Sequence, residues 1–215
     1  MIKKILSLIT IVLLAVHFGG CGITTADEKT APVQEVQENA DVGISNLCEA
    51  ILHRDDESIL KAMLSRDELE RNMLLGFTVQ FQESSGGIFT DEQANRIGKQ
   101  YLELLKKVNV KTNILSGDNH TARVEVKVNQ FDFNDLNKKE MQAELKKRSY
   151  FVNNETELVE ELTKIYIKNL SSLEPKGEAS FVVDCYYDEG RKLWQPNDRI
   201  VFEASIVTSA FKFQP

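Results

Sequence analysis

Cysteine carries the most distinctive chemistry in this sequence, and one of its three cysteines stands at the end of an apolar run. Cys21 follows two glycines, and residues 5–18 before them are largely apolar and come directly after two lysines. A positive start, a short apolar core and a small-residue end are typical of an export signal, and the run is too short for a stable membrane span. The pattern therefore predicts that residues 1–20 direct the chain out of the cytoplasm.

The junction Phe18-Gly19-Gly20-Cys21 resembles the lipobox of bacterial lipoproteins, although Phe18 stands where that family usually has Leu. In the family, a signal peptidase cleaves before the cysteine, whose sulfur carries a diacylglyceryl group. A thiolate is the best nucleophile that a chain offers for such a thioether. The resemblance implies cleavage between Gly20 and Cys21, lipidation of Cys21, and a bacterial cell membrane as the partner of the resulting lipid anchor.

The residues after Cys21 have a composition that does not favour folding. Residues 21–44 are rich in Thr, Ala, Glu and Gln and contain no aromatic residue, so they predict a flexible tether ahead of a single domain at 45–215. Without the two signal lysines the chain has 24 basic and 33 acidic residues. This acidic balance argues against nucleic acid as a partner.

The folded part shows a helical period first and an alternating period later. The predicted elements are helices at 45–64 (interrupted at 53–58), 65–82 and 90–108, a hairpin at 110–128, helices at 135–148 and 154–170, and strands at 179–187, 193–194 and 199–211. Helices and hairpins segregated in this order predict an α+β fold with an antiparallel sheet and a helical insertion between two hairpins.

A second resemblance rests on the hairpin. The run ILSGDNHTARVEVKV at 114–128, followed by Gly190 and Trp194 after an acidic turn, is similar to uncharacterised bacterial lipoproteins with a nuclear transport factor two-like (ketosteroid isomerase-like) cone. The resemblance implies N-terminal helices that lean across a curved antiparallel sheet and can enclose a pocket. Members of this fold include isomerases, and most of the lipoproteins have no assigned function, so the fold does not determine the function.

Two further cysteines, Cys48 and Cys185, remain after Cys21. Outside the cytoplasm they could form a disulfide, and the alternative is a pair of buried free thiols, because both lie among apolar residues. His53 and His120 stand alone, and the sequence contains no CxxC, HxH or HExxH pattern. We therefore expect neither a metal nor a cofactor.

Two groups of side chains are candidates for a site inside the cone. An acid or base would come from Asp132, Asp184, Tyr186 or His120, although each position also suits an outward-facing strand or turn residue. Aromatic residues could line a ligand pocket, and core packing is the alternative. The predicted lining residues are Phe77, Phe81, Tyr101, Tyr166, Phe181, Tyr187 and Trp194.

Three functions follow from these observations. The first is a membrane-tethered, non-catalytic extracytoplasmic domain that binds a small ligand, a peptide or an envelope protein. The second is a lyase or isomerase of the cone type, which would need one of the acid or base candidates inside the pocket. The third is the solute receptor of an ABC importer, which the length and the order of elements disfavour because such receptors have two α/β lobes.

Overall fold

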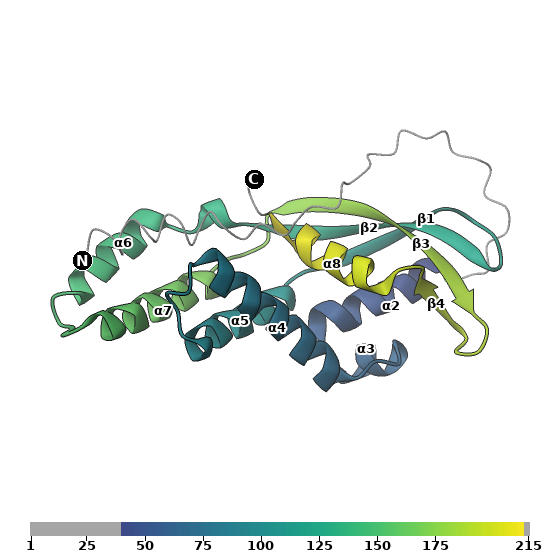
Figure 1. Ribbon diagram of the computed structural model, residues 1–215. Coiled ribbons are helices and arrows are strands. Elements are labelled where there is room, and N and C mark those ends of the chain that lie inside the picture. Colours follow the sequence, from purple (N-terminus) through teal and green to yellow (C-terminus); the bar gives the residue numbers. More distant parts are fainter. Residues whose placement is uncertain (1–39, 213–215) are drawn as a thin grey trace.

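The computed structural model describes residues 40–212, the side chain of residue 135 excepted, and these residues form one α+β body (Figure 1). Its helices are α2 (Ala40–His53), α3 (Asp56–Lys61), α4 (Arg66–Ser84), α5 (Asp91–Leu105), α6 (Lys138–Arg148), α7 (Glu155–Ser171) and α8 (Arg199–Ala210). Its strands are β1 (Val110–Gly117), β2 (Thr121–Asp132), β3 (Gly177–Asp188), β4 (Leu193–Pro196) and β5 (Phe211–Lys212).

The sheet confirms the predicted fold class. Strands β1, β2, β3 and β4 lie side by side in that order and pair antiparallel, and the short β5 pairs in parallel with the end of β2. The alternation in β2 follows the prediction, since Val124, Val126 and Val128 are buried and the residues between them are more exposed. One face of the sheet is therefore covered and the other is open to solvent.

The helices form two groups (Figure 1). Helices α2 and α8 cover the sheet, with α2 against β1 and β4 and α8 against β2 and β3. Helices α4 and α5 pack against each other, α5 packs against α7, and the α6–α7 hairpin extends past the end of the sheet. The predicted helical insertion between the two hairpins is confirmed, and it makes the molecule long in one direction.

Short polar side chains begin most of these helices, as the sequence predicts. Ser65 caps α4, Thr90 caps α5 and Asn154 caps α7, each accepting a hydrogen bond from the backbone N–H three residues later. The side-chain oxygen of Gln93 also accepts a hydrogen bond from the backbone N–H of Thr90, which completes a capping box. These local bonds satisfy donors that no helical carbonyl can reach.

Two predicted boundaries are wrong. Residues 199–210 form α8 and not a strand, because Asp198 accepts from the backbone N–H of Val201 and the buried residues Phe202, Ile206 and Ala210 recur at helical spacing. Residues 40–44, assigned to the tether, are the first turn of α2. A Cβ on Gly43 would lie 2.9 Å from the Cβ of Trp194, so this turn packs directly on β4.

Aromatic rings join the helices to the sheet end. The ring of Phe211 lies 5.7 Å from Phe131 and Phe133, 5.6 Å from Tyr101 and 6.0 Å from Phe77, measured between centroids. These distances are typical of offset or edge contacts between aromatic side chains. The five rings, hereafter the aromatic cluster, come from four segments, which are α4, α5, residues 131–133 at the end of β2, and β5.

Candidate functional site

Helix α4 lines a hollow on each of two faces. Against α5 it borders a charged hollow of about 430 Å³, lined by Arg54, Asp67, Glu70, Arg71, Leu74, Lys99, Leu102 and Glu103. Against α8 it borders an apolar groove of about 320 Å³, lined by Asn72, Met73, Gly76, Phe77, Ile200, Glu203, Ala204 and Val207. Both volumes fall in the range of ligand sites, so the two hollows can be told apart only by the side chains that line them.

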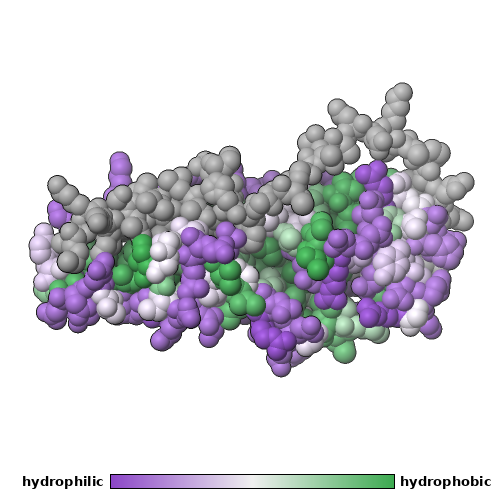
Figure 2. Space-filling view, viewed as in Figure 1, coloured by the Kyte–Doolittle hydropathy of each residue, from purple (hydrophilic) through white to green (hydrophobic). Residues whose placement is uncertain are grey.

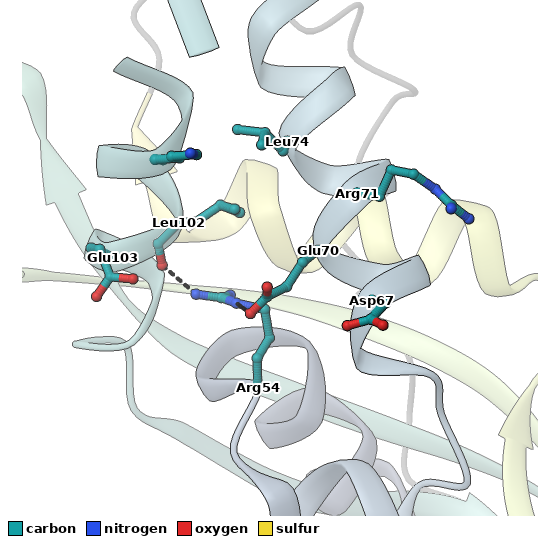
Figure 3. A pocket seen from close by; sticks show the side chains of 8 residues that line it. Arg54, Asp67, Glu70, Arg71, Leu74, Leu102 and Glu103 are labelled. Carbon is teal, nitrogen blue, oxygen red and sulfur yellow. Dashed lines mark hydrogen bonds and ion pairs between the residues drawn. The ribbon is translucent and has the colours of Figure 1, made fainter. Parts of the chain in front are cut away.

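Arg54 lies at the centre of the charged hollow and is committed to holding the fold together (Figure 3). Its backbone adopts a left-handed conformation, with φ of 56°, directly after the last residue of α2. One terminal nitrogen donates to the carbonyls of Ile51 at 3.0 Å and Leu52 at 2.8 Å, and the other donates to the carbonyl of Leu102 at 2.5 Å. The guanidinium thus joins the end of α2 to α5.

A carboxylate within the hollow partly balances the positive charge of Arg54. Burial lowers the pKa of its guanidinium, and Glu70, whose carboxylate lies 3.7 Å from Nε, opposes that shift. Figure 3 shows Glu70 directed at Arg54, while Arg71 extends away from it. Glu103 is ion-paired with Lys106 at 2.7 Å. Glu70 and Glu103 therefore both face cations that belong to the fold.

The apolar groove has a different character. On α8 the lining residues recur at helical spacing from Ile200 to Val207, and on α4 they surround Gly76. A Cβ built on Gly76 would meet no atom within 4 Å among the described residues, so the floor of the groove is open there. Glu203, which is paired with Arg199 at 2.7 Å, is the one charged residue among the described residues that line the groove.

Exposed apolar side chains extend the groove. Ile200 at one end is 81% exposed, and Val79, which follows Gly76 by three residues on α4, is 43% exposed. In Figure 2, hydrophobic residues reach the surface over the part where α8 and α4 lie in Figure 1, within a face that is largely hydrophilic. The groove cannot be predicted if residues 199–211 are assigned to a strand. The cap at Asp198 and the spacing of Phe202, Ile206 and Ala210 were the signals for a helix.

Most of the aromatic residues predicted to line a pocket pack against one another. Phe77 borders the apolar groove and also stacks on Tyr101, with centroids 5.3 Å apart. The other contacts are Phe81 with Phe89 and Tyr166, Phe181 with Phe202, and Tyr187 with Trp194, with centroids between 5.0 and 6.2 Å apart. Of the seven predicted lining residues, all except Phe77 are therefore explained by core packing, the alternative that the sequence left open.

Tyr101 and Tyr166 form a polar contact inside the core. Their hydroxyl oxygens lie 2.9 Å apart, and both side chains are buried between α5 and α7. Burial raises the pKa of Tyr101 well above its usual value and the pKa of Tyr166 to about 12. Two neutral hydroxyls that satisfy each other stabilise packing and are poor proton acceptors.

The four acid or base candidates are scattered over the surface. Asp184 is paired with Arg123 on the open face of the sheet at 3.3 Å, and Tyr186 is 42% exposed on the same strand. His120 lies in the β1–β2 turn, 3.8 Å from Glu189. Asp132 accepts from the backbone of Asn134, a bond that lowers the pKa of its carboxyl, the opposite of what a general base needs.

The cysteines of the folded part are free thiols. Cys48 on α2 and Cys185 on β3 are both buried and free, and the Cys185 thiol donates to the carbonyl of Ala122 at 3.2 Å. Burial raises the pKa of Cys48 far above its usual value and that of Cys185 to about 12. Within residues 40–212 no three His, Cys, Asp or Glu side chains are grouped closely enough to hold a metal ion.

Comparison with known proteins gives a likeness of fold. No family model matches the chain, and no curated protein matches it. The fold is similar to that of YcdA from Bacillus subtilis subsp. subtilis str. 168, a protein provisionally named a lipoprotein, with a TM-score of 0.65 at 16% sequence identity. The match covers 80% of this chain and 56% of YcdA, so this chain spans little more than half of the YcdA chain. Between residues 40 and 212, no helix has both the length and the apolar composition needed to cross a bilayer.

Proposed function

We propose that this protein is a bacterial lipoprotein whose extracytoplasmic domain binds a peptide segment of an envelope protein in the apolar groove between α4 and α8. The groove carries the proposal, because its lining is largely apolar, Ile200 is exposed at one end, and a Cβ on Gly76 would meet no described atom within 4 Å. The occupant is a segment with apolar side chains at helical spacing, which is how an amphipathic helix fills a groove between two helices. Catalysis is not part of the proposal.

The membrane anchor rests on the sequence around Cys21 and on the likeness to YcdA. The apolar run, the two glycines and the cysteine provide an export signal and a nucleophile for lipid attachment. The similar fold of a protein provisionally named a lipoprotein supports the same placement for this domain. The nuclear transport factor two-like resemblance agrees with the α+β architecture, and we retain it as the proposed family of the domain.

A peptide suits the groove better than a small ligand for two reasons. The groove is open along two helices, with Ile200 exposed at one end, so a small molecule would remain in contact with water. Gly76 and Ala204 leave space between the larger side chains of Met73 and Val207, which is room for inserted side chains of a partner.

The anchor is tested on the full chain expressed in a bacterial host. The membrane fraction, washed at high salt to remove weak associations, is digested and its N-terminal peptide is weighed. We expect a peptide that begins at Cys21 and carries a diacylglyceryl group, and we expect a Cys21→Ala variant to lack it. A washed membrane form that retains residues 1–20 would show that the anchor proposal is wrong.

The groove is tested with a variant that fills it. Gly76→Leu places a side chain on the open floor, and Asn95→Leu, on the exposed face of α5, adds the same side chain elsewhere as the matched control. Peptides from digested envelope proteins of the host are passed over each immobilised chain and identified by mass. We expect the wild type and Asn95→Leu to retain the same apolar peptides, and Gly76→Leu to lose them.

The same comparison can contradict the proposal. Peptides retained equally by Gly76→Leu and the wild type would show that they bind outside the groove. If the protein isolated from its own membranes carries a small molecule that is lost on denaturation, and Gly76→Leu does not carry it, the groove holds a small ligand and the peptide proposal is wrong. The anchor result does not depend on either outcome.

A further inference from the structure

The turn between α6 and α7 presents two neighbouring aromatic side chains to solvent. Tyr150 is 74% exposed and Phe151 is 86% exposed, and Phe151 is the most exposed large hydrophobic residue in the described part of the chain. Elsewhere between residues 40 and 212 aromatic rings are mostly packed against each other, so this pair is unusual. Aromatic residues on a protruding turn do not enclose a small ligand, but exposed apolar side chains of this kind can mark a site of contact with a protein or a membrane.

Basic residues lie directly before the aromatic pair. Lys146 and Lys147 end α6, are exposed, and make no ion pair with any described residue. Lysines at the end of a helix also interact with its dipole, so they alone would indicate nothing further. Arg148, by contrast, is engaged by Glu144 and Glu161. The tip therefore combines two free positive charges with two exposed rings.

The position of the tip matters as much as its composition. The α6–α7 turn lies at the far left end of the molecule in Figure 1, and α2, the first described helix, lies in the other half under the sheet. The chain as a whole is acidic, with a net charge of −7. Salt screens charges that are more than about 10 Å apart, so a surface touching the tip experiences mainly the charges at the end of the hairpin. These are Lys146 and Lys147 on α6 and the exposed carboxylates Glu155 and Glu157 at the start of α7.

We infer that Lys146, Lys147, Tyr150 and Phe151 form a membrane-contact site, in which the rings enter the headgroup region of an anionic bilayer and the lysines meet its phosphates. Aromatic side chains are favoured at this depth because one part of the ring is apolar and its edge or hydroxyl remains hydrated. Each lysine near an anionic surface strengthens binding by about fivefold. Together with a lipid on Cys21, the site places the long axis of the domain along the membrane.

This inference does not depend on the apolar groove, and it can be tested with a chain that lacks the lipid anchor on Cys21. The probe is a chain that begins at residue 21 and carries Cys21→Ser, which keeps every described residue. It is mixed with vesicles of phosphatidylcholine alone or with about 30% phosphatidylglycerol and floated on a density gradient at low salt. We expect the protein to float with the anionic vesicles and to be released by high salt.

Matched variants assign the binding to the tip. Tyr150→Ser with Phe151→Ser removes the rings, and Lys146→Ser with Lys147→Ser removes the charges. We expect the first pair to lower partitioning about tenfold on both kinds of vesicle and the second to abolish the preference for anionic lipid. Val182→Ser with Tyr186→Ser, on the open face of the sheet, removes an exposed apolar pair elsewhere and should change nothing.

A probe at the tip gives a second readout. A Phe151→Cys variant can be labelled there with an environment-sensitive dye, because Cys48 and Cys185 are buried with raised thiol pKa values. We expect its emission to rise and shift to the blue on anionic vesicles. Absence of wild-type flotation, or flotation that survives loss of the rings, would overturn the inference. Self-association that depends on the rings, without vesicle binding, would assign the tip to protein contact instead.

Discussion

The two faces of α4 border hollows of similar size and opposite character. Charged residues line the hollow toward α5, and at its centre the guanidinium of Arg54 contacts three carbonyls and Glu70. Apolar residues line most of the groove toward α8, and a Cβ built on Gly76 would meet no described atom within 4 Å. The central charge of the charged hollow is held by the fold itself, whereas the groove toward α8 offers mainly apolar side chains.

This comparison changes how a charged cluster should be interpreted. A buried charge needs partners, and satisfying it consumes the interactions that a ligand would otherwise make. Exposed apolar side chains gain by being covered, and nothing in the fold competes for them. The predictions that follow test whether polar groups here stabilise the fold and whether the groove does not.

The largest effect is expected from Arg54→Met. Methionine keeps much of the volume and the same left-handed backbone strain, but it leaves the carbonyls of Ile51, Leu52 and Leu102 without their donor. We expect the free energy of unfolding to fall by about 3 kcal/mol, measured by urea denaturation. Arg71→Met, in the same hollow but exposed, should change it by less than about 0.5 kcal/mol. Equal effects would mean that Arg54 is available to a ligand.

The buried tyrosine pair should show a smaller effect with strong coupling. Tyr101→Phe or Tyr166→Phe leaves the remaining hydroxyl buried without a partner, so each should cost about 1 to 2 kcal/mol of unfolding free energy. The double variant removes both hydroxyls and should cost less than the sum of the single changes. A double-mutant cycle by chemical denaturation measures this difference, and strict additivity would rule out the coupling.

Gly76→Leu tests the other side of the comparison. Because a Cβ at this position meets no described atom and leucine favours helix over glycine, we expect the variant to be more stable by about 0.5 to 1 kcal/mol. Peptide binding in the groove should nevertheless be lost. Stability is measured by denaturation and binding by retention of the same peptides. A clear loss of stability would show that the floor of the groove is part of the packed core.

The smallest effect concerns the partly exposed ion pairs of the α6–α7 hairpin. Hydrogen bonds from Lys164 and then Arg148 lower the pKa of Glu161, and those from Arg148 and then Lys168 lower the pKa of Glu144. Since these folded pKa values lie below the unfolded value of about 4.3, the stabilisation is present above that pH and is lost as the pH falls through the folded values.

Removal of the shared cation measures this contribution. Arg148→Met should cost about 0.5 kcal/mol near neutral pH, because solvent screens the pairs, and the difference from wild type should shrink as the pH falls below about 4.3 and through the lowered folded pKa values. Lys146→Met, which removes a charge without an ion pair among the described residues, is the control. A difference that persists unchanged in acid would assign the effect of Arg148→Met to lost packing of its aliphatic stem.

Local signals made much of the fold predictable. The caps at Ser65, Thr90 and Asn154 mark helix starts that the structure confirms, and the alternation in β2 identifies its buried face. Such signals act within a few residues, so no distant contact is needed to interpret them. Residues 199–210 were misassigned because Ile200, Val201 and Ile206 favour strands by type. The cap at Asp198 and the packing of the buried face of α8, which includes Phe202 and Ile206, against β2 and β3 favour the helix instead.

The candidate site could not be predicted in the same way. The groove joins residues 72–77 to residues 200–207, and no periodicity within either segment shows that they will face each other. The role of Arg54 depends on its φ of 56° and on burial, neither of which its residue type indicates. The exposed ring of Phe151 likewise follows from its place at the end of a protruding hairpin.

The aromatic cluster has a consequence for how quickly the native state is reached. Phe211 contacts rings as distant along the chain as Phe77, so the cluster cannot close while the chain is still emerging N-terminus first. Contacts between such separated segments slow folding, because the intervening chain must be ordered before they form. A chain delivered unfolded across a membrane would therefore expose α4 and α5 until Phe211 has crossed. During this interval proteases and chaperones compete for the incompletely folded chain.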